Sequence, residues 1–167
     1  MGAQNEKVAW FQHTIKEQQG GLIRYSQKIV KDEANAKDVV QDGFIKLWDQ
    51  RFPESKDLVP PWLYRICRNL AIDHYRKHKK HTSIDGIENE FELLGSEEEK
   101  LMNKEVFTAL KSLPKKNIEV MVLMFQEGLS YKEIAEVTGI TTSYVGVIIH
   151  QSLKTLRVVL GEEFSHV

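Results

Sequence analysis

Cysteine is nearly absent from the sequence, which has only Cys67 among its 167 residues. One cysteine excludes an internal disulfide and a metal site built from paired cysteines. It agrees with a reducing compartment, where a lone cysteine is most simply a small buried apolar residue. Apolar runs of the roughly 20 residues that a membrane helix needs are also lacking. The N-terminal MGAQNEKVAW has no apolar segment like that of a signal peptide. We expect a cytoplasmic protein with no membrane insertion.

Strand patterns and catalytic motifs are scarce as well. Apolar residues recur at helical spacing almost everywhere, and at 41% apolar and 28% charged residues the chain can bury cores. This predicts an all-α protein of one ordinary domain or two small ones. The sequence lacks a P-loop, an HExxH motif and a carboxylate cluster, so a nuclease using Asp73 and His74 has little support. We predict no enzymatic activity, no cofactor and no small-molecule substrate.

The near-zero net charge of −1 conceals a local asymmetry. Residues 62–81 contain six Lys and Arg against one acid, whereas residues 82–99 contain seven acids and no base. The basic block indicates a nucleic-acid partner. The acidic segment predicts a flexible linker between two helical domains, 1–81 and 100–167. Its acidity is explained by solvation of a flexible segment, or by an acidic tether that shields the basic helix or mimics nucleic acid.

The segment AKDVVQDGFIKLWDQ (36–50) has an apolar stripe that is typical of a core-facing helix, formed by Val40, Phe44, Leu47 and Trp48. Val39 and Ile45 fall outside that stripe, among acids. They are either a partner surface or ordinary scattered aliphatics.

The segment PWLYRICRNLAIDHYRKHKKH (61–81) predicts a helix that begins at Pro61. Aromatic residues at Trp62, Tyr64 and Tyr75 alternate with bases, a combination that suits phosphates and unstacked DNA bases. The alternative is a solvated basic helix end that complements its own dipole. Histidines 74, 78 and 81 have helical spacing for a metal, but the neighbouring Lys and Arg would repel a cation. We therefore predict no metal site and interpret them as part of the basic patch.

The C-terminal part predicts a helix-turn-helix. A helix over 112–128 is followed by Ser130 and Glu133, whose spacing is that of a capping box, and by Gly139, which can end the second helix. A third helix is expected from about Thr142 to Leu160. Its first part lacks Lys and Arg, and its outer face contains Ser143, Val147, His150 and Lys154.

Three motifs carry a resemblance to the extracytoplasmic-function (ECF) subfamily of bacterial RNA polymerase sigma factors, over essentially residues 10–161. They are AKDVVQDGFIKLW, PWLYRICRNLAIDHYRK and LPKKNIEVMVLMFQEGLSYKEIAEVTGI. The resemblance implies a helical sigma domain 2 (1–81), an acidic linker (82–99) and a helix-turn-helix sigma domain 4 (100–167). It also implies core RNA polymerase and promoter DNA as partners, with an anti-sigma factor as a possible further one. The alternative is a free-standing helix-turn-helix regulator that binds duplex operators by itself.

The resemblance assigns residues to three surfaces. The segment that docks on polymerase in the family matches Asp38, Val39, Gln41, Asp42, Phe44 and Trp48. The loop that captures a flipped base and the helix that grips the −10 element match Lys56, Asp57, Trp62, Arg65, Arg68, Asn69, Asp73, Arg76 and Lys77. The −35 surface is expected to comprise Ser130, Tyr131, Thr141, Thr142, Ser143, Val147, His150 and Lys154.

The third helix departs from the family pattern. Where relatives commonly place bases, this chain has Gly146, Ile148 and Gln151, and Ile148 is expected to be buried. Phosphate binding at the helix N-terminus and contact of Val147 with thymine methyls would then remain.

Overall fold

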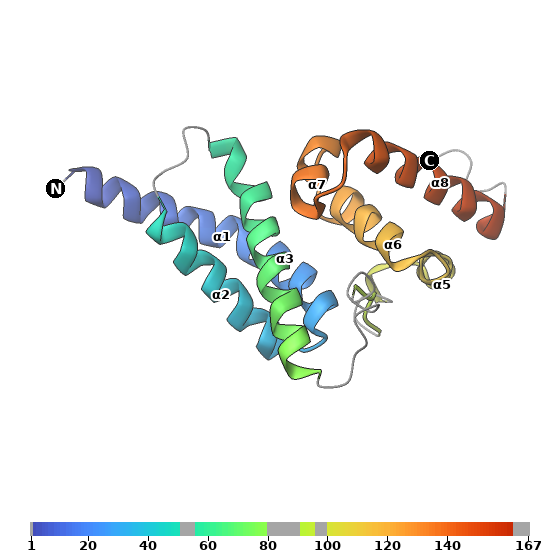
Figure 1. Ribbon diagram of the computed structural model, residues 1–167, viewed down its shortest axis with the longest axis horizontal. Helices are drawn as coiled ribbons and strands as arrows, with labels where there is room; N and C mark the ends of the chain where they lie inside the picture. The colour runs from blue at the N-terminus through green and yellow to red at the C-terminus, as the bar shows by residue number, and fades with distance from the viewer. Residues whose placement is uncertain (1, 51–55, 80–90, 96–99, 162–167) are drawn as a thin grey trace. The chain divides into compact units, whose positions relative to one another are not determined.

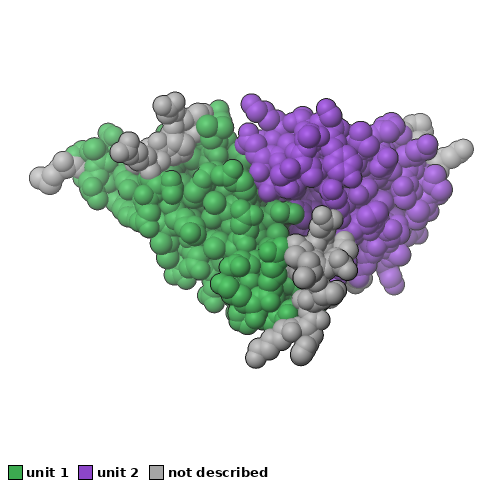
Figure 2. Space-filling model, in the orientation of Figure 1, with its two compact units in different colours: residues 1–81 green, residues 82–167 purple. Residues whose placement is uncertain are grey.

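A computed structural model describes residues 2–50, 56–79, 91–95 and 100–161 of the chain. The chain forms two compact units, unit 1 (residues 1–81) and unit 2 (residues 82–167) (Figure 2). All the regular elements in the described ranges are helices, as predicted (Figure 1). None of these helices combines the length and the apolar character that crossing a bilayer would require.

Unit 1 consists of three long helices, α1 (Gly2–Val30), α2 (Glu33–Asp49) and α3 (Val59–His78), with a short 3-10 helix η1 (Lys56–Leu58) before α3. The carboxylate of Asp32 accepts the Ala34 amide at 3.1 Å and so caps α2. Prolines occupy the first turn of α3, where a missing amide donor costs no helical hydrogen bond. The predicted helix therefore begins slightly before Pro61.

The core of unit 1 lies where α1, α2 and α3 pack against one another. Tyr25 of α1 and Tyr64 of α3 are buried with their ring centroids 5.5 Å apart, in an edge-to-face arrangement. A Cβ atom added at Gly43 of α2 would lie 2.8 Å from the Cys67 sulfur, so α2 approaches α3 closely. Burial raises the pKa of Cys67 to about 12. Cys67 is thus the small buried residue that was predicted.

In its described residues, unit 2 contains the helices α5 (Lys104–Lys111), α6 (Lys115–Met121), α7 (Tyr131–Thr138) and α8 (Thr142–Leu160). The helix predicted over 112–128 starts after Pro114 and changes at Val122 to a π-helical turn, η3 (Val122–Gln126). Such turns are rare and short because their hydrogen bonds span one residue more than in an α-helix. Gly128 follows with a positive φ of 73°.

The helix-turn-helix has the predicted local chemistry. Ser130 Oγ accepts a hydrogen bond from the Glu133 amide at 3.1 Å, and the Glu133 carboxylate accepts one from the Ser130 amide at 3.0 Å. Gly139 has φ 80°, the left-handed conformation that ends α7. Thr141 then caps α8 by accepting the Tyr144 amide at 3.1 Å. The capping box, the turn and the bounds of α8 are all as expected from the sequence.

The described part of the acidic segment differs from the expected flexible linker. Phe91 is only 2% exposed and Leu93 only 7%. Between them, Glu92 forms an ion pair with Lys115 of α6 at 2.7 Å. Residues 91–94 are therefore anchored to unit 2, because two apolar side chains are more stable out of water. Residues 82–90 and 96–99 of the predicted linker lie outside the described residues.

Candidate polymerase and nucleic-acid interfaces

The exposed face of α2 is acidic with one apolar residue. Asp38, Gln41 and Asp42 are exposed, and Ile45, 53% exposed, lies on the same face by helical spacing. An exposed aliphatic side chain among carboxylates suits a partner surface that offers both an apolar contact and basic groups. The structure thus brings together four side chains that the sequence had indicated.

Two residues that were predicted to dock on the polymerase are not on the surface of α2. Val39 is 3% exposed and Phe44 is 6% exposed, so both belong to the core of unit 1. Phe44 packs at 87° against the ring of Phe11 in α1, with centroids 6.2 Å apart. Phe44 belongs to the apolar stripe that was expected in the core, whereas Val39 lies outside that stripe and is buried because α2 packs against both α1 and α3. These side chains support the acidic face and do not form it.

Trp48 is half-buried at the end of α2. Its ring lies 5.0 Å from that of Phe11, and the Lys7 ammonium sits 4.1 Å from its ring centroid. Lys7 also donates to the Trp48 carbonyl at 3.0 Å. The tryptophan therefore ties the end of α2 to the beginning of α1, and one part of its ring system remains accessible.

Helix α3 carries a continuous polar stripe. Trp62, Arg65, Asn69, Asp73 and Arg76 recur at intervals of three and four residues, which places them on one face. Trp62 is half-buried and the other four are exposed. The stripe combines cationic groups for phosphates, an amide for base edges and an aromatic ring for stacking. Such a combination suits single-stranded nucleic acid.

The remaining residues predicted for the −10 surface flank this stripe. Lys77 is exposed and pairs with Asp73 at 3.1 Å. Arg68 lies off the stripe and is half-buried, whereas Lys56 and Asp57 are exposed in η1, just before α3. Tyr64 was expected among the DNA-facing aromatic residues, and this is wrong because its ring is buried against Tyr25.

The carboxyl end of α3 holds a cluster of two lysines around one phenol, the Lys31–Tyr75–Lys79 cluster. Lys31 Nζ donates to Tyr75 Oη at 3.4 Å, and Lys79 Nζ donates to the same oxygen. Both ammonium groups also lie over the Tyr75 ring, 4.8 and 4.9 Å from its centroid. Burial alone would raise the pKa of Tyr75, but the hydrogen bonds from Lys79 and Lys31 and their charges outweigh it, so the pKa is lowered.

Histidines 74 and 78 stack on each other, with ring centroids 4.1 Å apart, and His78 Nδ1 lies 2.9 Å from the carbonyl of His74. The described part of the chain contains no group of three side chains that could hold a metal ion. The third residue of the predicted pattern, His81, lies outside the described residues.

The outer face of α8 is exposed and almost neutral. Ser143, Val147, His150 and Lys154 are all accessible, with Val147 46% exposed, as are Thr141 and Thr142 at the helix start. Ile148 is buried, as predicted. Ser130 and Tyr131 of α7 are exposed too, so the structure leaves every residue predicted for the −35 surface accessible.

The sequence interpretation did not include two residues at this face, Tyr144 of α8 and Lys116 of α6. Tyr144, 43% exposed, projects from the first turn of α8, and the Lys116 ammonium of α6 lies 4.5 Å from its ring centroid. Tyr131 lies close to α8 as well, because a Cβ atom added at Gly146 would be 3.5 Å from its ring. The paired lysines of PKK at 114–116, at the start of a helix, were the available sequence clue. Positive charge thus reaches this face from α6.

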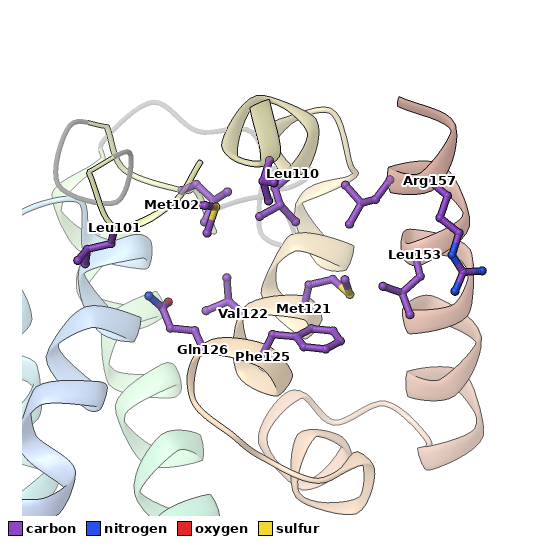
Figure 3. A pocket seen from close by; sticks show the side chains of 12 residues that line it. Leu101, Met102, Leu110, Met121, Val122, Phe125, Gln126, Leu153 and Arg157 are labelled. Carbon is purple, nitrogen blue, oxygen red and sulfur yellow. The ribbon is translucent and has the colours of Figure 1, made fainter. Parts of the chain in front are cut away.

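Unit 2 also has an apolar cavity of about 580 Å³ (Figure 3). Its walls come from α5, α6, η3, α8 and the segment before α5, and Phe125, Met121 and Leu153 are among them. Arg157 of α8 lines the same cavity. Arg157 is also exposed and lies near Lys154 by helical spacing, so the Lys and Arg residues of α8 are both in its second half.

Two family models match the chain. Sigma-70 region 2 matches residues 14–81 and sigma-70 region 4 matches residues 109–158. Among curated proteins, RNA polymerase sigma factor SigV of Bacillus subtilis (strain 168) is 31% identical over 150 residues, covering 89% of this chain and 90% of SigV. ECF RNA polymerase sigma factor SigM of the same organism is 29% identical over 140 residues, covering 81% of this chain and 86% of SigM.

Solved structures resemble the chain over most of its length. CnrH, in complex with the cytosolic domain of CnrY, gives a TM-score of 0.61 at 25% identity, covering 90% of this chain and 86% of that chain. The sigma factor RpoE of Bartonella quintana, in complex with the anti-sigma factor NepR, gives 0.62 at 20% identity, covering 90% and 96%. The second likeness shows a shared fold.

Proposed function

The chain belongs to the sigma-70 family of RNA polymerase sigma factors, within its ECF group, and on that premise we propose how its surfaces divide the work. The protein directs core RNA polymerase to promoters and helps to melt the −10 region. We assign the −10 element to the polar stripe of α3, the −35 element to the outer face of α8, and the polymerase to the acidic face of α2.

The stripe on α3 is the observation that carries this proposal. It presents Arg65 and Arg76 with Trp62 and Asn69 on one exposed face. Melted DNA exposes both its phosphates and its base faces, so a protein that holds the single strand needs cations and an aromatic platform together. The outer face of α8 offers fewer cationic and aromatic groups, and we therefore assign DNA melting to unit 1.

The acidic face of α2 is our candidate for the polymerase. Asp38 and Asp42 provide charge and Ile45 provides an apolar contact, while buried Val39 and Phe44 fix the helix beneath them. Removing the exposed charge of Asp42 should leave the core folded. Replacing Trp48 should not, because its ring packs against Phe11 and Lys7. Asp42 is therefore the residue on which to test docking.

We further propose that an anti-sigma factor binds this chain. RpoE, which shares its fold, was solved in complex with the anti-sigma factor NepR. We place the protein in the cytoplasm, where RNA polymerase works, and assign it no catalytic activity of its own. Its relatives are sigma factors, which act by binding.

Reconstitution with core RNA polymerase tests the proposal. The isolated chain should bind duplex DNA weakly and should gain promoter specificity only in the holoenzyme, since its net charge is −1 and α8 is nearly neutral. Asp42→Ala should weaken polymerase binding with an unchanged melting temperature. Glu6→Gln, an exposed charge on α1, is the matched control and should change neither. Tight, sequence-specific binding by the isolated chain would favour the free-standing regulator instead.

A further inference from the structure

The strap, residues 91–95, attaches the acidic segment to unit 2 before α5 begins. Glu92 pairs with Lys115 of α6 at 2.7 Å, and the two side chains are 42% and 37% exposed. Leu93, 7% exposed, is one wall of the apolar cavity, whose other walls include residues of α5, α6, η3 and α8. The strap is therefore held by one ion pair and one buried leucine, both on unit 2.

These two interactions are of modest strength. Burial of a leucine side chain is favourable, whereas an ion pair between partly exposed groups contributes little by itself. A segment that few contacts hold can detach and reattach while the rest of the domain stays folded. The attachment of the strap can therefore change without unfolding unit 2.

The strap decides how much chain remains to separate the two units. Twelve residue steps lie between Lys79, which follows the last residue of α3, and Phe91. A fully extended chain covers at most about 3.6 Å per residue, so these steps reach about 43 Å at most. With the strap detached, the tether runs from Lys79 to Lys100, and its limit rises to about 76 Å. Both limits are covalent and hold for any conformation of the tether.

The promoter fixes the distance that this tether must span. The −10 element is assigned to α3 and the −35 element to α8. Each base pair added between the elements moves them about 3.4 Å further apart and turns one about the other by roughly a tenth of a helical turn. A tether strengthens two-site binding most when its length matches the span, and the effect falls off for other lengths. A short tether therefore discriminates against wrong spacings more sharply than a long one.

We propose that the strap sets the range of −10 to −35 spacings that the holoenzyme accepts, with Glu92, Leu93 and Lys115 as specificity-determining residues. This inference rests on the proposed assignment of the two elements to the two units. The strap acts in addition to the polymerase contacts that position each unit. While it is attached, the short tether disfavours displaced −35 elements. When it detaches, the longer tether lets α8 follow them.

The test uses promoters whose spacer is shortened or lengthened in single base pairs from the length that the wild-type holoenzyme binds best. Glu92→Gln and Lys115→Gln each break the ion pair, and a double variant adds Leu93→Ser to Glu92→Gln. At the best spacer, affinity should fall by about two- to threefold, since nearly doubling a tether lowers the effective concentration by about that factor. The loss of affinity on adding two base pairs should shrink by a similar factor.

The two single variants change the charge of unit 2 in opposite directions. A broadening that both share therefore cannot come from altered attraction of DNA. Glu92→Lys with Lys115→Glu restores the pair and should restore wild-type selection. Lys104→Gln, an exposed lysine at the start of α5, is the matched control and should leave the spacer profile unchanged.

Nuclear magnetic resonance order parameters of residues 91–95 in the full chain report the attachment independently. An anchored backbone gives values near about 0.85, and a detached one gives values below about 0.6. Mobility and spacer selection should change together. A mobile strap with an unchanged spacer profile overturns the proposal, as does broadened selection with a rigid strap.

Two further outcomes separate the possible failures. A strap that stays rigid in the Glu92→Gln, Leu93→Ser variant shows that these residues do not anchor it, which refutes their assignment. If the wild-type holoenzyme binds all spacers equally, the assignment of the two elements to the two units fails. A selective wild type whose profile ignores release of the strap refutes only this inference.

Discussion

Helices α3 and α8 are almost equal in length, at 20 and 19 residues, yet they offer DNA different chemistry. The stripe of α3 exposes arginines beside Trp62, whereas the outer face of α8 exposes Ser143, Val147 and His150 with Lys154. Charge neutralisation supplies affinity without sequence information, and groups that touch base edges supply specificity. We therefore expect unit 1, whose stripe adds Trp62 and Asn69 to its cations, to supply most of the binding free energy and of the −10 discrimination, and unit 2 to add weaker contacts to −35.

The largest expected effect is on promoters with one element scrambled. Scrambling −10 should reduce open-complex formation by the wild-type holoenzyme far more than scrambling −35, because the side chains suited to single strands lie on α3. Open complexes are measured by the reactivity of unpaired bases on matched fragments. If scrambling −35 does the greater damage, α8 reads DNA better than its side chains suggest and the comparison is reversed.

Neutralising charges on α3 and on α8 compares how many DNA phosphates each helix contacts. Arg76→Gln with Lys77→Gln should make the salt dependence of promoter binding shallower by up to about 1.8, against up to about 0.9 for Lys154→Gln. Arg76 should contribute most of the larger value, because Lys77 is already paired with Asp73 at 3.1 Å. Equal slopes for the two sets of variants would contradict a dominant α3.

Val147 tests apolar reading by α8. If its exposed side chain contacts a thymine methyl, Val147→Ala should weaken binding to the −35 element by roughly 1 to 3 kcal/mol. Replacing thymine by deoxyuridine in −35 removes the methyl, and the variant should then show little further loss. Val159→Ala, an equally accessible valine near the end of α8, is the control. A loss that persists on the deoxyuridine promoter means that Val147 acts through packing.

Two mid-helix glycines compare the packing behind the two surfaces, and their substitution should change folding stability. Gly43→Ala places a Cβ atom 2.8 Å from the buried sulfur of Cys67, and such overpacking lowers the free energy of unfolding by about 1 to 3 kcal/mol. Gly146→Ala meets Tyr131 at 3.5 Å, an ordinary contact, so its better helix propensity should stabilise unit 2 by up to roughly 1 kcal/mol.

Denaturant unfolding monitored by circular dichroism measures both changes. The reactivity of the Cys67 thiol reports unit 1 alone, since the residue is buried there. Adding Cys67→Ala should relieve part of the Gly43→Ala cost, because the obstructing sulfur is then absent. A Gly43→Ala variant as stable as wild type would mean that α2 and α3 can separate without cost.

Local features were predictable because their chemistry is local in the chain. The capping box of Ser130 and Glu133, the turn at Gly139 and the start of α8 each depend on residues within a few positions of one another. The same holds for the stripe of α3, which follows from helical periodicity once the helix is known. Periodicity gives the direction of a buried face but not its width. Val39 and Tyr64 were assigned to surfaces for that reason, and both are buried.

The sequence by itself determined the all-helical class, the two helical blocks with an acidic segment between them, and the family, because spacing and composition encode these directly. The tertiary structure decided which side chains meet. Lys31 reaches Tyr75 across 44 positions, Lys116 lies over Tyr144, and Glu92 pairs with Lys115 of α6 from a stretch that composition describes only as acidic. Such contacts depend on how helices pack, and packing is set by the shape and burial of many side chains together, which no local pattern records.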